Sequence, residues 1–143
     1  MKTCNDIMTS NPTCCLAGDA VMKAAQVMKN EDVGAVPVVD DATNKKLMGI
    51  ITDRDIVLKV VAAGQNHNAP INSVMSKNPV TCRADDAVQN VMDRMAQHQV
   101  RRIPVVDGKD RVVGIVSQAD LAIRADQPER TANVLEEISQ PVG

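Results

Sequence analysis

The chain carries much of its own sequence twice. A shift of 67 places aligns MTSNPTCCLAGDAV (residues 8–21) with MSKNPVTCRADDAV (75–88), and VGAVPVVD (33–40) with VRRIPVVD (100–107). Over residues 8–40, 14 of the 33 positions are identical in the two copies. One copy, of about sixty residues, would be marginally stable alone. The repetition therefore predicts two similar units that cover each other.

Each copy has the pattern strand, helix, strand, strand, helix. A short strand follows the Asn-Pro pair (13–15 and 80–82), and a helix begins near Asp19 or Asp86. Two β-branched strands joined by a polar turn come next, and a second helix begins at Thr52 or Ser117. The predicted fold is α+β, with two β-α-β-β-α repeats related by pseudo-two-fold symmetry. The predicted boundaries are 7–64 for repeat 1, 70–124 for repeat 2 and 125–143 for a C-terminal tail. The tail is expected to be helical, with Val134, Leu135 and Ile138 on one side.

The composition excludes several classes of partner. The chain has no Phe, Tyr or Trp, so its core must be aliphatic and no aromatic platform exists for stacking nucleic-acid bases. A net charge of −2 gives no attraction to polyanions or anionic membranes. No apolar run is long enough to span a membrane, and no signal peptide is recognisable. We therefore expect a cytoplasmic protein that binds neither membranes nor nucleic acids.

The four cysteines do not form a recognisable metal-binding or disulfide pattern. Cys4, Cys14, Cys15 and Cys82 show no CxxC spacing and have no histidine nearby. We expect reduced, mostly buried thiols that form no disulfide and bind no metal, with Cys4 the most exposed because it lies near a terminus.

The repeated heptapeptide GIITDRD (49–55) and GIVSQAD (114–120) admits two interpretations. Thr52 with Asp55, and Ser117 with Asp120, fit a capping box at a helix N-terminus. The same geometry suits a nucleotide: a hydroxyl and unpaired N–H groups for a phosphate, and an aspartate for a ribose diol. A cap alone does not require the preceding glycine, which often marks close approach by a ligand or another backbone.

The paired motifs resemble a tandem of CBS domains, the modules named after cystathionine beta-synthase. The matching segments are NPTC with NPVTC, VPVVD with IPVVD, and GIITDRD with GIVSQAD, covering about residues 7–124. The resemblance implies adenosine-containing ligands such as AMP, ATP, NAD or S-adenosylmethionine in clefts between the repeats. It implies that the aspartates hold ribose hydroxyls and that the Thr and Ser hydroxyls hold a phosphate.

The resemblance also implies further site residues. Backbone near Thr81 would face the Asp55 site, and backbone near Thr13 the Asp120 site. Val36 and Ile103 would sandwich the adenine. The nucleotide-binding candidates are thus Thr13, Val36, Thr52, Arg54, Asp55, Thr81, Arg102, Ile103, Ser117 and Asp120. Arg54 and Arg102 are either solvated surface residues or ligands of a polyphosphate in one cleft, because the other copy has no arginine at either position.

No Walker loop, catalytic triad or paired acid–base constellation is present, so we expect no enzyme, no catalytic cofactor and no catalytic residues. The expected function is a stand-alone regulatory module that senses an adenine nucleotide and signals to an effector protein in trans. The alternative is a ligand-free structural dimerisation module. We expect a homodimer in either case, formed through apolar helix faces that include Ile56, Val60 and Leu121.

Overall fold

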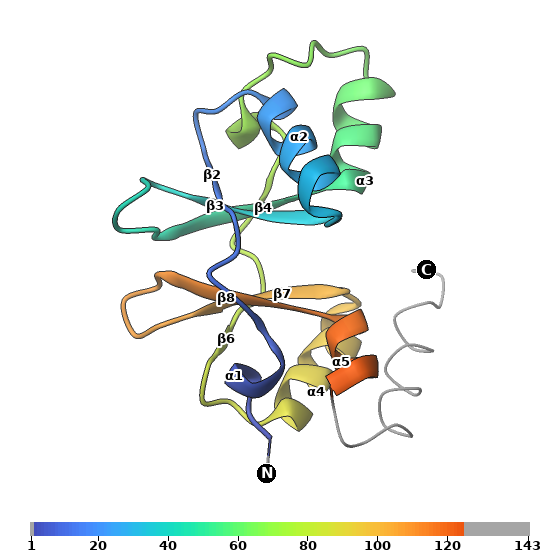
Figure 1. Ribbon diagram of the computed structural model, residues 1–143. Helices are drawn as coiled ribbons and strands as arrows, with labels where there is room; N and C mark the ends of the chain where they lie inside the picture. The colour runs from blue at the N-terminus through green and yellow to red at the C-terminus, as the bar shows by residue number, and fades with distance from the viewer. Residues whose placement is uncertain (1, 125–143) are drawn as a thin grey trace. The chain divides into compact units, whose positions relative to one another are not determined.

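The computed structural model describes residues 2–124, and the predicted tail helix lies outside the described residues. The chain forms two compact units. We call residues 12–79 and 109–112 the first-repeat unit, and residues 2–11, 80–108 and 113–124 the second-repeat unit. Figure 1 shows that in each unit the two long helical segments lie on one side of the sheet.

The first-repeat unit contains the predicted order of elements. They are β2 (Cys15–Leu16), α2 (Val21–Glu31), β3 (Ala35–Val39), β4 (Leu47–Thr52) and α3 (Asp53–Ile56), which continues into the π-helical turn η1 (Val57–Val61). A 3₁₀ turn, η2 (Ile71–Ser73), and a short strand, β5 (Ser76–Lys77), follow. The sheet order is β2-β3-β4-β5, with β2 parallel to β3 and the other pairs antiparallel.

The second-repeat unit repeats this plan. It contains α1 (Cys4–Ile7), β1 (Thr9–Ser10), β6 (Cys82–Arg83), α4 (Val88–His98), β7 (Arg102–Val106), β8 (Val112–Ser117) and α5 (Gln118–Arg124). Its sheet order is β1-β8-β7-β6. The α+β class and the repeated β-α-β-β-α order are therefore confirmed.

The first helix of each repeat begins at Val21 or Val88, one residue later than a cap by Asp19 or Asp86 would place it. Neither aspartate is the N-cap, and each one accepts a backbone hydrogen bond within the turn before the helix. Asp19 accepts a hydrogen bond from the N–H of Leu16 at 2.8 Å, and Asp86 accepts one from the N–H of Arg83 at 2.8 Å. Their side chains are engaged in these turns, and the helix N-caps are alanines.

Aliphatic side chains fill a hydrophobic core in each unit, as the lack of aromatic residues requires. The first core includes Val21, Ala24, Val36, Val38 and Ile51. The second includes Val88, Val91, Met92, Met95 and Leu121.

The core also corrects the apolar face proposed for dimerisation. Val60 is 4% exposed and Leu121 is 1% exposed, so both pack inside their own units and cannot form an exposed face. Three apolar residues of η1 are exposed instead: Val57 (55%), Leu58 (49%) and Val61 (71%). All three lie in the π-helical turn η1, whose buried residue is Val60.

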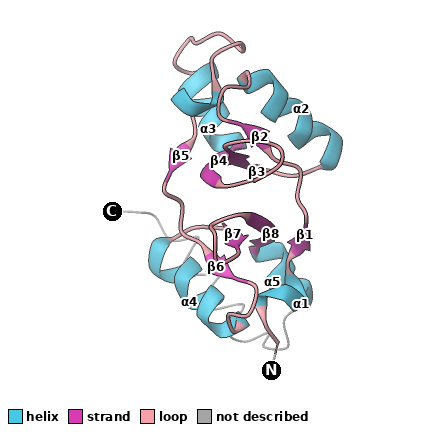
Figure 2. Ribbon diagram, turned by 90° about the vertical axis from the view of Figure 1, so that its left-hand side faces the viewer, coloured by secondary structure: helices cyan, strands magenta, loops and turns pink. Residues whose placement is uncertain are grey.

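The first residues of each predicted repeat lie in the unit of the other repeat. β1, near the start of repeat 1, pairs with β8 of the second-repeat unit, and β5, near the start of repeat 2, pairs with β4 of the first-repeat unit (Figure 2). These edge strands are only two residues long and were not predicted. Each one extends its sheet by pairing with the strand that leads into a heptapeptide turn, β8 or β4.

Candidate functional site

The first heptapeptide motif lies where β4 enters α3. The Thr52 hydroxyl accepts a hydrogen bond from the N–H of Asp55 at 3.1 Å, and the Asp55 carboxylate accepts one from the N–H of Thr52 at 3.0 Å. This is the predicted capping box. The second carboxylate oxygen of Asp55 pairs with the Lys59 ammonium at 3.2 Å, and Lys59 also donates to the carbonyl of Val74 at 3.0 Å. Lys59 was not among the predicted site residues, although its i,i+4 spacing from Asp55 is typical of a helix ion pair.

The second motif has the same geometry where β8 enters α5. The Ser117 hydroxyl accepts from the N–H of Asp120 at 3.2 Å, and the Asp120 carboxylate accepts from the N–H of Ser117 at 2.9 Å. The repeated sequence therefore encodes a repeated cap. Both hydroxyls accept in this arrangement, so each still has a proton to donate to another acceptor.

The backbone of the first motif does not offer the unpaired N–H groups that were expected for a phosphate. The N–H of Asp53 donates to the carbonyl of Gly34 at 2.9 Å. The N–H of Arg54 donates to the Asp53 carboxylate at 2.8 Å, and that of Asp55 is taken by the cap. This expectation was wrong because the loop before β3 and the Asp53 side chain already satisfy the first turn. A phosphate here would have to be held by side chains.

The glycine of each heptapeptide is explained by close approach of another strand. Gly49 pairs with Lys77, and a Cβ at Gly49 would lie 2.6 Å from the carbonyl oxygen of Ser76. Gly114 pairs with Ser10, and a Cβ there would lie 3.1 Å from the carbonyl oxygen of Thr9. Of the two roles that the sequence suggested for these glycines, contact with another backbone is the one observed.

The two threonines predicted to contribute backbone make local hydrogen bonds. The Thr13 hydroxyl donates to the Glu31 carboxylate at 2.8 Å in the first-repeat unit. The carbonyl of Thr81 accepts from the Arg94 guanidinium at 2.6 Å in the second-repeat unit. Arg94 also contacts the Asp86 carboxylate at 3.4 Å. The guanidinium thus fixes the backbone before β6, a role that the sequence pattern did not reveal.

The remaining candidates divide into core and surface residues. Val36 and Ile103 are each 0% exposed and lie in the hydrophobic cores of their own units, so neither presents an exposed surface for sandwiching an adenine. Arg54 is exposed in the first turn of α3, and Arg102 is half-buried at the start of β7. The two arginines belong to different units.

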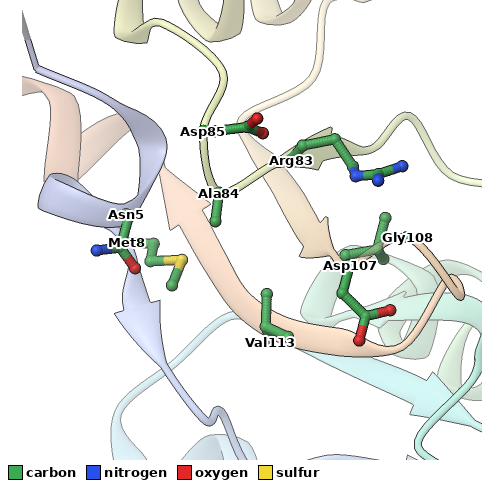
Figure 3. A pocket seen from close by; sticks show the side chains of 9 residues that line it. Asn5, Met8, Arg83, Ala84, Asp85, Asp107, Gly108 and Val113 are labelled. Atoms are coloured by element: carbon green, nitrogen blue, oxygen red, sulfur yellow. The ribbon is translucent and has the colours of Figure 1, made fainter.

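A cavity of about 340 Å³ lies in the second-repeat unit. Figure 3 shows charged side chains from the β6 end and from the turn after β7 around it. Its lining consists of Asn5, Met8, Arg83, Ala84, Asp85, Val106, Asp107, Gly108 and Val113. None of the predicted nucleotide-binding residues lines this cavity.

The cysteines differ from expectation at one position. Cys4 is 0% exposed, because α1 packs into the core of the second-repeat unit instead of projecting as a free terminus. Burial raises the pKa of the Cys14 thiol, and burial followed by the nearby Asp19 charge raises that of Cys15 to about 11. Both thiols are therefore protonated at neutral pH. Among residues 2–124, no group of three or more His, Cys, Asp and Glu side chains is placed to hold a metal ion.

Comparison with known families decides the identity of the repeats. The model of the CBS domain matches residues 4–62 and 71–125. The chain belongs to the CBS-domain family. It is 39% identical over 140 residues to the uncharacterized protein YlbB of Bacillus subtilis, a match that covers 98% of this chain and 93% of YlbB. The match therefore spans nearly the whole length of both proteins.

Solved CBS pairs share the fold. Hypoxic response protein 1 of Mycobacterium tuberculosis, which is 38% identical over 123 residues, matches 85% of this chain and 84% of its own length. A crystal structure of Hypoxic Response Protein I with two coordinated zinc ions superimposes with a TM-score of 0.76, at 38% identity, over 85% of this chain and 97% of that one. The CBS domain pair of protein MJ0100, in complex with 5'-methylthioadenosine and S-adenosylmethionine, gives a TM-score of 0.77 at 31% identity, over 85% and 97% of the two chains. No helix among the described residues is both long enough and apolar enough to cross a membrane.

Proposed function

We propose that this CBS pair is a regulatory module without catalytic activity, which binds an adenosine-containing ligand at its heptapeptide motifs and signals to a partner protein. The observation that carries the proposal is the doubled arrangement of a hydroxyl residue and an aspartate where a strand enters a helix. The binding of 5'-methylthioadenosine and S-adenosylmethionine by the MJ0100 pair supports adenosine as the shared part of the ligand.

The cap and the ligand site are compatible at Asp55. A carboxylate has about four lone-pair positions. The capping bond uses one of them on one oxygen, and Lys59 approaches the other oxygen. Two ribose hydroxyls can donate to the remaining positions while the cap stays intact. In this proposal Thr52 donates its hydroxyl proton to the ligand, and Arg54 attracts any phosphate.

Thermal unfolding with a panel of ligands tests the proposal, using AMP, ATP, NAD, S-adenosylmethionine and 5'-methylthioadenosine. Unfolding must be followed with a dye, because the chain has no Trp or Tyr. A ligand at a hundred times its dissociation constant stabilises the folded state by about 2.7 kcal/mol. At least one adenosine compound should raise the melting temperature, and guanosine or cytidine should not.

Two substitutions at Asp55 separate the cap from the site. Asp55→Asn keeps an oxygen that can cap the Thr52 N–H but loses the charge, whereas Asp55→Ala removes both. Removing the cap should cost about 1 kcal/mol of folding free energy. Losing charge-assisted bonds to ribose should weaken binding by about 1.5–3 kcal/mol, or roughly tenfold to over a hundredfold. Both variants should therefore lose ligand stabilisation, and only Asp55→Ala should lose most of the cap. Equal ligand shifts in wild type, Asp55→Asn and Asp120→Asn would instead favour a structural module whose motifs only cap helices.

A further inference from the structure

Two cysteines that are far apart in sequence meet in the core of the second-repeat unit. The Sγ atoms of Cys4 in α1 and Cys82 in β6 lie 3.2 Å apart, although the residues are separated by 78 positions. The two residues are 0% and 1% exposed. We propose that Cys4 and Cys82 form a reversible disulfide under oxidising conditions, which fastens the N-terminal segment, residues 2–10, to β6 of the same unit.

The backbone already holds the two cysteines in register. The N–H of Cys4 donates to the carbonyl of Asp86 at 2.9 Å, and the N–H of Asn5 donates to that of Ala84 at 2.9 Å. The segment therefore runs beside the chain that leaves β6, and Cys82 faces it. A sulfur–sulfur bond is about 2.0 Å long. The bond therefore requires the two sulfur atoms, now 3.2 Å apart, to approach by roughly another 1.2 Å.

The other unit provides an internal comparison. Ile71 occupies the place of Cys4 there, and Cys15 that of Cys82. The N–H of Ile71 donates to the carbonyl of Asp19 at 2.8 Å, in the same register as in the second-repeat unit. Ile71 and Cys15 are both fully buried in that core. The position therefore accepts an isoleucine, so packing does not require a thiol at Cys4, and the facing pair is particular to the second-repeat unit.

The oxidation balances with a peroxide as the oxidant. The Cys4 thiolate attacks one peroxide oxygen; an S–O bond forms, the O–O bond breaks, and hydroxide leaves with the thiol proton as water. The Cys82 sulfur then attacks the Cys4 sulfur; the S–S bond forms, the S–O bond breaks, and the Cys82 proton leaves with the hydroxide as a second water. The contact with Cys4 and burial both raise the pKa of the Cys82 thiol, which slows its reaction at neutral pH.

The disulfide would control the opening of an edge of the sheet. Residues 2–10 end in β1, which pairs with β8 through Thr9 and Ser10. Terminal segments generally open at lower free energy than the core of a domain. Buried thiols react only after such opening, so oxidation should be slow. Once formed, the cross-link keeps the segment on the sheet and restricts the unfolded chain.

The experiment uses the full chain, reduced and then exposed to hydrogen peroxide, with free thiols blocked by N-ethylmaleimide under denaturing conditions. A protease that cleaves before aspartate separates Cys4 (residues 1–5) from Cys14 and Cys15 (residues 6–18). We expect the peptide with Cys4 to be joined to the peptide with Cys82, a loss of two hydrogens per chain, and full reversal by dithiothreitol. The oxidised protein should melt roughly 5 °C or more above the reduced protein.

Matched variants distinguish the pair from general thiol oxidation. Cys4→Ile copies the residue of the other repeat, so it should fold, show no cross-link and melt at the same temperature before and after peroxide. Cys15→Ala removes the counterpart of Cys82 in the other unit and should keep the cross-link. A disulfide that joins two chains, a bond through Cys14 or Cys15, higher oxidation without a bond, or a cross-link that leaves the melting temperature unchanged would each overturn the proposal.

Discussion

At the residue scale, the carboxylate of a heptapeptide aspartate can make several interactions at once. Asp55 caps α3 with one oxygen and meets Lys59 with the other, and Asp120 caps α5 in the same way. The first-turn N–H groups of α3 are already bonded, so anion binding cannot rest on the backbone there. Arg54 is then the exposed cation closest in sequence to the cap, and the copy of this motif in repeat 2 has Ala119 in its place.

Arg54 should therefore discriminate between ligands by their phosphates. Arg54→Ala should weaken binding of ATP and AMP by roughly tenfold or more, because a charge-assisted hydrogen bond contributes about 1.5–3 kcal/mol. It should leave 5'-methylthioadenosine, which has no phosphate, within about twofold of wild type. Isothermal titration with each ligand provides the comparison. An equal loss for charged and uncharged ligands would show that Arg54 acts on the fold of the motif and not on a phosphate.

At the element scale, the sequence predicted the helices and strands that have a clear periodicity. It missed β1 and β5, the two short strands that each pair in the unit of the other repeat (the exchanged strands). Apolar residues at helical spacing gave α2 and α4, and the β-branched strands gave β3, β4, β7 and β8. β1 and β5 have only two residues each, too few for any alternation, and their pairing partners lie more than 25 positions away. Gly49 and Gly114, each inside an apolar strand, indicated that something approaches the backbone closely. They did not indicate whether it was a ligand or another strand.

The candidate site was predictable from the sequence only where its structure is local. The caps at Thr52 and Ser117 follow from spacing alone, because a capping box is local. Burial of Cys4 and of Val36 depends on the packing of distant segments, which periodicity does not encode.

The exchanged strands make the two glycines unequal in their tolerance of a side chain. Gly49→Ala should destabilise the fold by about 1–3 kcal/mol, because its Cβ would meet the backbone carbonyl of Ser76, which cannot move without breaking the β4–β5 pairing. Gly114→Ala should cost less, since its nearest contact is the flexible Met8 side chain. Gly18→Ala is the matched control, with no atom within 4 Å of the new Cβ, and should be neutral or slightly stabilising. Urea unfolding of the three variants gives the order. A Gly49→Ala protein as stable as Gly18→Ala would contradict it.

At the scale of the whole molecule, the first-repeat unit exposes an apolar helix face. Val57, Leu58 and Val61 lie within four positions of one another on η1 and are 49–71% exposed. Val57 and Val61 lie about one helical turn apart and Leu58 is next to Val57, so the three give η1 an exposed apolar strip. A contiguous exposed apolar strip of this kind is typical of an interaction surface. We expect its partner to be a second copy, because an isologous contact buries the same strip on both chains.

The dimer should therefore depend on Val61, the most exposed residue of the strip. Val61→Glu would place a carboxylate against the partner's apolar strip, at a cost of several kcal/mol, and should weaken association by at least a hundredfold. Light scattering should show twice the 15.3 kDa chain mass for the wild type at micromolar concentration, and the chain mass itself for the variant. Ala42→Glu adds the same charge at an exposed position in the turn between β3 and β4 and should remain dimeric. A wild-type protein of 15.3 kDa would refute the dimer, and a dimeric Val61→Glu would show that the chains associate through another surface.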